Sequence, residues 1–318
     1  MITLINKDRF IYDLEYRILD IVEEYQTTGQ VEISTNKEGI CLDRVKFYDL
    51  LDYTCAKFNI DKSKVIIHTN NLLEKHDEYT IVIMPNNFIK NKPFNNLIPN
   101  SYIPFKSKQL RTIGCFVGRP MWNRIILISW LFDNFKEKCL LTCNYTASDS
   151  DKAYIRLDEV NFYYSDALEQ VITFLKHTPM TLDLRYDKLL EYDACYKGLF
   201  NLLNYYDQIF LDLVTETYVM GNTFFPTEKT TRPIVAKTPF IVMGPKNYLS
   251  NLRKMGFKTF NRWWNEDYDN YEGTRRVIEI QRLITNIMKW PQERLHTVLL
   301  EMEETLEHNY KCNYDKDL

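Results

Sequence analysis

Two kinds of segment alternate along this chain: short runs of β-branched and other apolar residues, and longer segments with apolar residues at helical spacing. Several of the short runs are followed by polar turns rich in asparagine or glycine. This alternation is typical of an α/β fold whose strands end at polar loops. The expected strands are 31–35, 64–69, 79–84, 110–117, 140–144, 209–215 and 239–243; the expected helices are 8–25, 44–58, 123–135, 166–176, 228–237, 248–255 and two stretches within 274–308 separated at Pro291.

The alternation occurs in both halves of the chain, and a stretch rich in Asn and Pro, 86–104, lies between them. At 318 residues the chain is long enough for two compact cores. We therefore expect two Rossmann-like domains facing a cleft, followed by a C-terminal helical tail. The expected boundaries are 1–107 for an acceptor-side α/β domain, 108–290 for a donor-binding domain and 291–318 for the tail.

Composition argues against several classes of function, although a local basic cleft for nucleic acid stays open. The net charge of −3 provides no general attraction to a polyanion such as nucleic acid. The seven cysteines are odd in number and mostly lie in apolar segments, as expected for reduced thiols of a cytoplasmic protein. The longest apolar run, Ile125 to Phe132, is far shorter than the ~20 residues of a membrane span, and the N-terminus does not resemble a signal peptide. No His, Asp or Glu residues stand at convincing metal-ligand spacing, so we expect no metal or other cofactor.

The most informative stretch is LVTETYVMGNTFFPTEKTTRPIVAKTPFIVMG, which ends at Gly244. Thr227 is suited to cap a helix whose first turn contains Glu228 and Lys229. A helix N-terminus presents unpaired N–H groups and partial positive charge, which favour a diphosphate. Lys229 and Arg232 are three residues apart and share a helix face, so they add two cations there. Glu228 repels phosphate and is better suited to accept hydrogen bonds from ribose hydroxyls.

The order of these pieces resembles the donor site of GT-B glycosyltransferases, most closely the α1,3-fucosyltransferase type. A strand ends at Glu216, a helix begins at Thr227-Glu228-Lys229, and a Pro-led strand runs from Pro239 to Gly244. The strand 110–117, followed by Gly118-Arg119 and a helix with Arg124, resembles the opening of the same domain and a similar arrangement in exostosin-type transferases. The resemblance covers roughly the last two-thirds of the chain.

This resemblance implies a metal-independent glycosyltransferase of the Leloir type. We expect an inverting reaction, and a retaining one stays open as the alternative. The substrates would be a nucleoside-diphosphate sugar and a glycan or glycoconjugate acceptor. Glu228 would bind the ribose, Lys229 the pyrophosphate, and Arg119 would act as a second phosphate clamp. The segment Glu216-Thr217-Tyr218 departs from the Glu-Asn-Ser of the family, so the sugar and the base are not implied. The implied donor-binding residues are Arg119, Arg124, Glu216, Thr227, Glu228, Lys229 and Arg232.

A second dense patch, GFKTFNRWWNEDYD, spans 256–269. It resembles the segment that follows the Thr-Glu-Lys motif in phage and giant-virus proteins of the glycosyltransferase type. Trp263, Trp264 and Tyr268 are candidates to hold an acceptor or a sugar by stacking, or alternatively to pack this loop onto the donor domain. We expect the acids Glu266, Asp267 and Asp269 to stay solvated or to accept sugar hydroxyls.

An inverting transfer also needs a base near the attacking hydroxyl, which the N-terminal domain would supply. The candidates are Asp43, His68, Glu74, Asp77 and Glu78, and each is equally consistent with a solvated surface charge, so none is assigned. Two other functions remain open. A viral DNA-base glycosyltransferase would need a basic cleft, and a catalytically inactive binding module would lack a carboxylate opposite the phosphate site.

Overall fold

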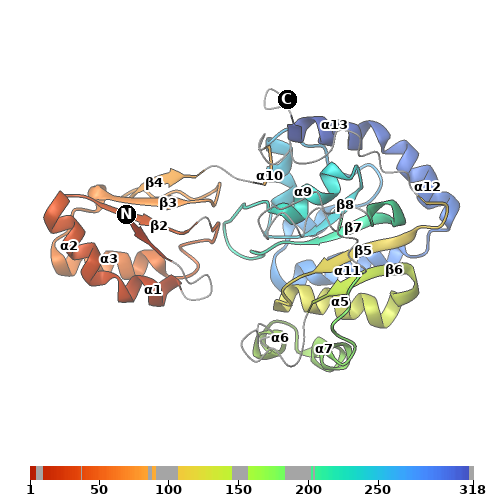
Figure 1. The fold of residues 1–318 in the computed structure, drawn as a ribbon, viewed down its shortest axis with the longest axis horizontal. Helices are drawn as coiled ribbons and strands as arrows, with labels where there is room; N and C mark the ends of the chain where they lie inside the picture. Colours follow the sequence, from red (N-terminus) through yellow and green to blue (C-terminus); the bar gives the residue numbers. More distant parts are fainter. Residues whose placement is uncertain are drawn as a thin grey trace, which may run out of the picture. The chain divides into compact units, whose positions relative to one another are not determined.

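The computed structural model describes residues 1–4, 10–36, 38–84, 88–90, 107–144, 157–182, 202 and 205–314. The chain divides into two compact units. Unit 1 comprises Met1–Asn86 and Met220–Phe225, and unit 2 comprises Asn87–Val219 and Pro226–Leu318. Each unit contains a parallel four-stranded sheet, which confirms the predicted α/β class (Figure 1). Most of the expected linker at 86–104 lies outside the described residues.

The strands of unit 1 follow one another in chain order across the sheet, and every neighbouring pair is parallel. Right-handed crossovers that all step in one direction place their helices on the same face of a sheet. The three helices of this unit accordingly cover one face (Figure 1). The elements are β1 (Ile2–Thr3), α1 (Phe10–Tyr16), α2 (Ile18–Thr28), β2 (Val31–Ser34), α3 (Phe47–Phe58), β3 (Val65–Thr69) and β4 (Thr80–Ile83).

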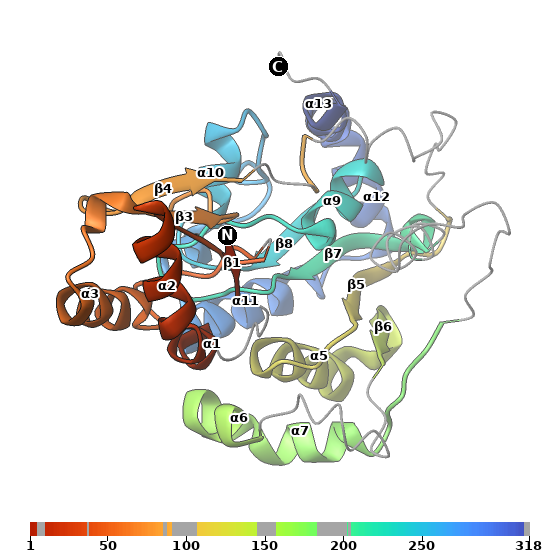
Figure 2. The same ribbon diagram turned by 60° about the vertical axis from the view of Figure 1, so that its left-hand side comes forward.

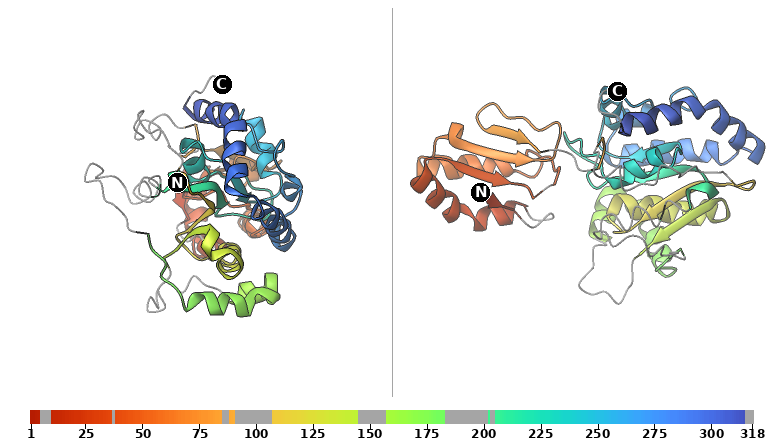
Figure 3. Two further views of the ribbon diagram at one scale, coloured as in Figure 1. Left: turned by 90° about the vertical axis from the view of Figure 1, so that its right-hand side faces the viewer. Right: turned by 45° about the horizontal axis from the view of Figure 1, so that its top comes forward.

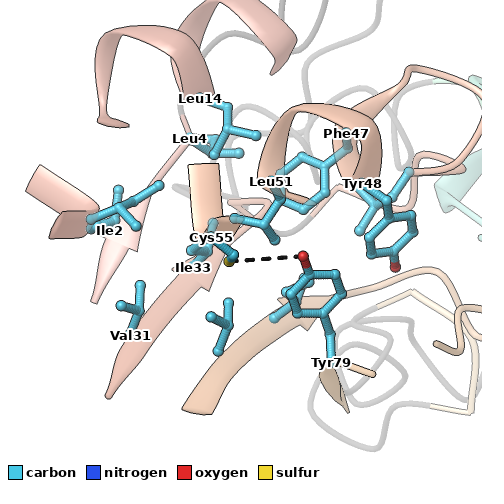
Figure 4. Close-up of a cluster of buried hydrophobic side chains, with 14 of the residues drawn as sticks. Ile2, Leu4, Leu14, Val31, Ile33, Phe47, Tyr48, Leu51, Cys55 and Tyr79 are labelled. Carbon is cyan, nitrogen blue, oxygen red and sulfur yellow. Dashed lines mark hydrogen bonds between the residues drawn. The ribbon is translucent and has the colours of Figure 1, made fainter. Parts of the chain in front are cut away.

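The core of unit 1 lies between its sheet and these helices. Alternate residues of β2, Val31 and Ile33, are fully buried, as expected when one face of a strand packs inward. They pack in one cluster with Phe47 and Leu51 of α3 and Leu14 of α1 (Figure 4). Burial of these apolar side chains supplies the main stabilisation of the unit.

Unit 2 has the strand order β6-β5-β7-β8, again all parallel. The chain passes from β5 to β6 on one side, then crosses back to form β7 and β8 on the other. α5 and α11 cover one face of this sheet, whereas α9, α12 and α13 lie on the other (Figures 1 and 3). α6 and α7 pack on α5 (Figure 2). The elements are β5 (Arg111–Val117), α5 (Trp122–Phe135), β6 (Cys139–Cys143), α6 (Leu157–Tyr164), α7 (Leu168–Leu175), β7 (Ile209–Thr215), α9 (Glu228–Val235), β8 (Phe240–Met243), α10 (Tyr248–Lys254), α11 (Gly273–Ile287), α12 (Gln292–Glu301) and α13 (Glu303–Tyr314).

In two of the expected helical stretches, the structure has a break that the sequence analysis did not predict. The stretch expected at 8–25 forms two helices, α1 and α2, because the backbone leaves helical geometry at Arg17. The C-terminal stretch forms three helices instead of two, with a second break at Met302 after the expected one at Pro291. Neither Arg17 nor Met302 is a helix-breaking residue type, so the sequence contains no local signal for these turns. The sequence analysis also missed β1 and α6.

Candidate functional site

The reversal of strand order in unit 2 marks a position where α/β proteins bind ligands. In open parallel sheets, ligands lie outside the carboxyl ends of the strands at the point where the order reverses. Here that point lies between β5 and β7, which pair directly. β5 leads through Gly118-Arg119-Pro120 into α5, and β7 leads into Glu216 and Thr217. The predicted donor-site residues therefore belong to the loops and helix starts at this position.

Glu216 organises the beginning of α9. Its side chain is buried, and its carboxylate accepts hydrogen bonds from the Thr227 amide (3.0 Å) and the Thr227 hydroxyl (2.6 Å). It also accepts from the hydroxyls of Thr230 (2.7 Å) and Tyr248 (3.0 Å). Four donors from the protein itself thus surround this carboxylate. The arrangement makes Glu216 a group that positions α9.

The first turn of α9 has the predicted cap. Thr227 is its N-cap residue, and the Thr227 hydroxyl accepts a hydrogen bond from the Lys229 amide at 3.3 Å. The Lys229 ammonium lies 2.7 Å from Glu228 Oε1, 3.1 Å from Thr227 Oγ1 and 3.5 Å from Thr217 Oγ1. Burial alone would raise the pKa of Glu228, but the charges of Lys229 and Arg232 lower it to about 2. Glu228 is therefore ionised at neutral pH.

Arg124 is a second cation, after Lys229, that contacts the Thr217 hydroxyl. It lies in the first turn of α5, is buried, and donates to the Arg119 carbonyl (3.2 Å) and to Thr217 Oγ1 (3.3 Å). Burial lowers the pKa of Arg124 to about 10, so it remains protonated at neutral pH. No acceptor among the described residues contacts its buried Nε. The helix α5 itself begins at Met121 without a side-chain cap.

Arg232, one turn into α9, is the most distinctive group of the site. It is only 6% exposed, and among the described residues its buried Nε has no hydrogen-bond partner. The guanidinium carbon lies 5.7 Å from the centroid of the Phe116 ring. Burial would lower the pKa of Arg232, but Tyr206 and the carboxylates of Asp212 and Glu228 raise it, so the charge is kept. Buried arginines in proteins are normally paired. Arg232 therefore holds a buried charge whose Nε donor is unused among the described residues.

Asp212 supplies a nearby negative charge from the middle of β7. It is fully buried and accepts a short hydrogen bond from the Tyr206 hydroxyl through Oδ2. Burial raises the pKa of Asp212 to about 6, although Arg232 and Tyr206 act in the opposite direction. The sequence analysis did not single out this residue, but an aspartate inside the apolar run IFLDLVT was a visible signal.

The remaining predicted donor residue, Arg119, is placed differently. Its backbone carbonyl contributes to the site by accepting from Arg124, whereas its side chain is exposed. The structure thus brings six of the seven predicted residues into one buried or partly buried group and leaves the Arg119 side chain at its edge.

The aromatic patch at 256–269 packs inside unit 2. Trp264 and Tyr268 are buried, and Trp264 lies against Phe260 with ring centroids 5.4 Å apart. Trp263 is partly exposed and donates to Glu301 at 3.0 Å. For Trp264 and Tyr268 these contacts match the packing alternative.

The acids of this patch were expected to stay solvated or to accept sugar hydroxyls, and for Glu266 and Asp269 the first alternative is wrong. Glu266 has a 7% exposed side chain and accepts from the Phe260 amide at 2.7 Å. Asp269 caps α10 by accepting from the Leu249 and Ser250 amides, and it pairs with the buried Arg276 at 3.0 Å. Both carboxylates satisfy backbone N–H groups that would otherwise be buried without partners.

The candidate bases of unit 1 are dispersed. Glu74 is partly buried and accepts from Tyr48 (2.9 Å) and Asn71 (2.9 Å), and burial raises its pKa. His68 lies 3.4 Å from Glu32, and Glu78 pairs with Lys62 at 2.9 Å. Asp43 and Asp77 are exposed.

Two other kinds of feature are absent from the described residues. None of these residues forms a group of three or more His, Cys, Asp or Glu side chains that would hold a metal ion. No described helix has both the length and the apolar character needed to cross a bilayer.

No known protein family, curated protein or solved structure matches the chain.

Proposed function

We propose that the chain is a glycosyltransferase of GT-B type that binds a nucleoside-diphosphate sugar in unit 2 and transfers the sugar to a glycan or glycoconjugate. The diphosphate would lie at the carboxyl ends of β5 and β7. This proposal depends mainly on the buried guanidinium of Arg232, whose Nε finds no acceptor among the described residues. A guanidinium presents a planar fork of donors that matches the oxygens of a phosphate group.

The neighbouring groups favour the same ligand. Arg124 and Lys229 both contact Thr217 Oγ1, so two further cations converge on one point. The uncapped start of α5 offers backbone N–H groups and the positive end of a helix dipole. Phosphate oxygens would accept from these groups.

The charged residues then divide into groups with different roles in the proposed reaction. Arg232, Arg124 and Lys229 would stabilise the negative charge that grows on the departing diphosphate, which is the role a metal ion serves in other transferases. Glu228, ionised because its pKa is low, would accept hydrogen bonds from the ribose hydroxyls. Arg119 would approach a phosphate from the exposed side. Glu216 would act through α9, since its carboxylate is bonded to Thr227 and Thr230.

A thermal-shift panel of UDP, GDP, CDP and dTDP tests this proposal. A diphosphate present at a hundred times its dissociation constant adds ~2.7 kcal/mol to the free energy of unfolding. We expect at least one nucleotide to stabilise the wild type, and Lys229→Ala to remove most of that stabilisation. If none of the four raises the melting temperature at millimolar concentration, the proposed donor is wrong.

A further inference from the structure

Six residues of the connection between β7 and α9 belong to unit 1. The chain leaves unit 2 after Val219, contributes Met220–Phe225 to unit 1, and re-enters unit 2 at Pro226. The two ends of this segment continue into the two stretches of chain that carry the phosphate-site residues Thr217 and Thr227. How unit 1 holds the segment therefore matters for the site.

The side-chain amide of Asn71, which follows β3, holds the segment. Its Nδ2 donates to the Asn222 carbonyl at 3.0 Å, and its Oδ1 accepts from the Phe224 amide at 2.9 Å. The Leu72 amide donates to the Phe224 carbonyl at 3.0 Å. The Thr223 hydroxyl also donates to the Gly39 carbonyl. These hydrogen bonds to the backbone of the segment fix its position within unit 1, as the bonds between paired strands fix a strand in a sheet.

Packing fixes the segment as tightly as the hydrogen bonds do. Phe224 and Phe225 are 2% and 8% exposed. A Cβ added at Gly39 would clash with Cβ of Phe225, so the backbone and this side chain are in direct contact. The segment is an integral part of unit 1.

The anchored residues are close in sequence to the phosphate site. Phe225 precedes the N-cap residue Thr227 by two positions, and Met220 follows Thr217 by three. Consecutive Cα atoms are ~3.8 Å apart, so such a short connection absorbs little displacement. Release of the segment from unit 1 would therefore remove one restraint on the stretches that carry Thr217 and Thr227, whose hydroxyls Lys229 contacts.

We infer that Asn71 is a positioning residue for the phosphate site and acts through Met220–Phe225. Anion binding in unit 2 would in turn stabilise the hydrogen bonds between Asn71 and this segment. The inference rests on the proposed function. Coupling of this kind is reciprocal by thermodynamic necessity. Anion binding and anchoring of the segment would favour each other, because both require the chain from Thr217 to Thr227 to be ordered.

Calorimetric titration of inorganic pyrophosphate into Asn71→Ala and Asn309→Ala tests the positioning role. Asn309 is a matched control because its amide holds Lys258 in the same way, accepting from its N–H at 2.7 Å and donating to its carbonyl at 2.8 Å. We expect Asn71→Ala to weaken pyrophosphate binding by about fivefold or more, the equivalent of one neutral hydrogen bond. Asn309→Ala should stay within about twofold of the wild type, since the two backbone bonds that it loses hold Lys258 and do not involve Met220–Phe225.

A second measurement uses the wild type alone and does not require a variant to fold. Pyrophosphate should slow hydrogen exchange of the Leu72 and Phe224 amides in unit 1. If pyrophosphate binds but neither the affinity of Asn71→Ala nor this exchange changes, the positioning role is wrong and the proposed function stands. If the wild type does not bind pyrophosphate, the proposed function and the positioning role both fail.

Discussion

The buried environment of Asp212 predicts how the free energy of unfolding depends on pH. It is fully buried in β7, and burial raises its pKa from an ordinary value of 3.8 to about 6. The folded state therefore favours the neutral acid, whereas the unfolded chain ionises near its ordinary pKa. A tenfold change in an equilibrium constant corresponds to ~1.36 kcal/mol, so the difference between these two pKa values means that ionisation costs the folded state about 3 kcal/mol. This stability is present at low pH and is lost as the pH rises through the pKa of the folded state.

The substitution Asp212→Asn removes this titration with little change in size. The variant also removes a charge near Arg232, but that effect is constant because Arg232 stays protonated throughout. We expect the free energy of unfolding of the variant, relative to wild type, to rise by about 2 kcal/mol between about pH 4.5 and about pH 7.5. Urea denaturation of both proteins across this range measures the difference. A difference that stays constant with pH would refute the assigned environment of Asp212.

Three further predictions concern the rest of unit 2. Tyr248→Phe should lower the free energy of unfolding by about 1–3 kcal/mol in urea denaturation, because its buried hydroxyl donates to the Glu216 carboxylate; an unchanged midpoint would contradict this. Trp264→Ala should cost about 3–5 kcal/mol and Trp263→Ala clearly less, because only Trp264 is buried; equal losses would be unexpected. Transfer from the nucleotide-sugar should survive EDTA, because Arg124, Lys229 and Arg232 would stabilise the leaving diphosphate; complete loss that added metal restores would show otherwise.

Much of this fold could be predicted from local patterns. Strands such as 209–215 are indicated by apolar runs that end at polar turns, and the structure has β7 at these residues. The cap at Thr227 and the shared face of Lys229 and Arg232 also depend on residues within one or two turns. Interactions between near neighbours are accessible to sequence reasoning for that reason.

The features that sequence reasoning missed depend on distant segments. The fourth donor to Glu216 is Tyr248, which reaches it only because β8 and α10 fold beside α9. Asn71 and Phe224 are separated by 153 positions, so no local pattern reports their hydrogen bond. The expectation that Asp269 is solvated failed for the same reason, since its partner amides at the start of α10 lie about twenty residues away.

The central claim is that the buried guanidinium of Arg232, whose Nε has no partner among the described residues, binds phosphate. Calorimetric titration of inorganic pyrophosphate into wild type, Arg232→Gln and the control Arg275→Gln tests it most directly. Arg275 is a suitable control because it is an exposed arginine of unit 2 that pairs with Glu279 at 2.6 Å. We predict that Arg232→Gln weakens binding by about tenfold or more, the loss expected for a charge-assisted hydrogen bond, and that Arg275→Gln binds as the wild type does. Equal affinities of Arg232→Gln and wild type would contradict the claim.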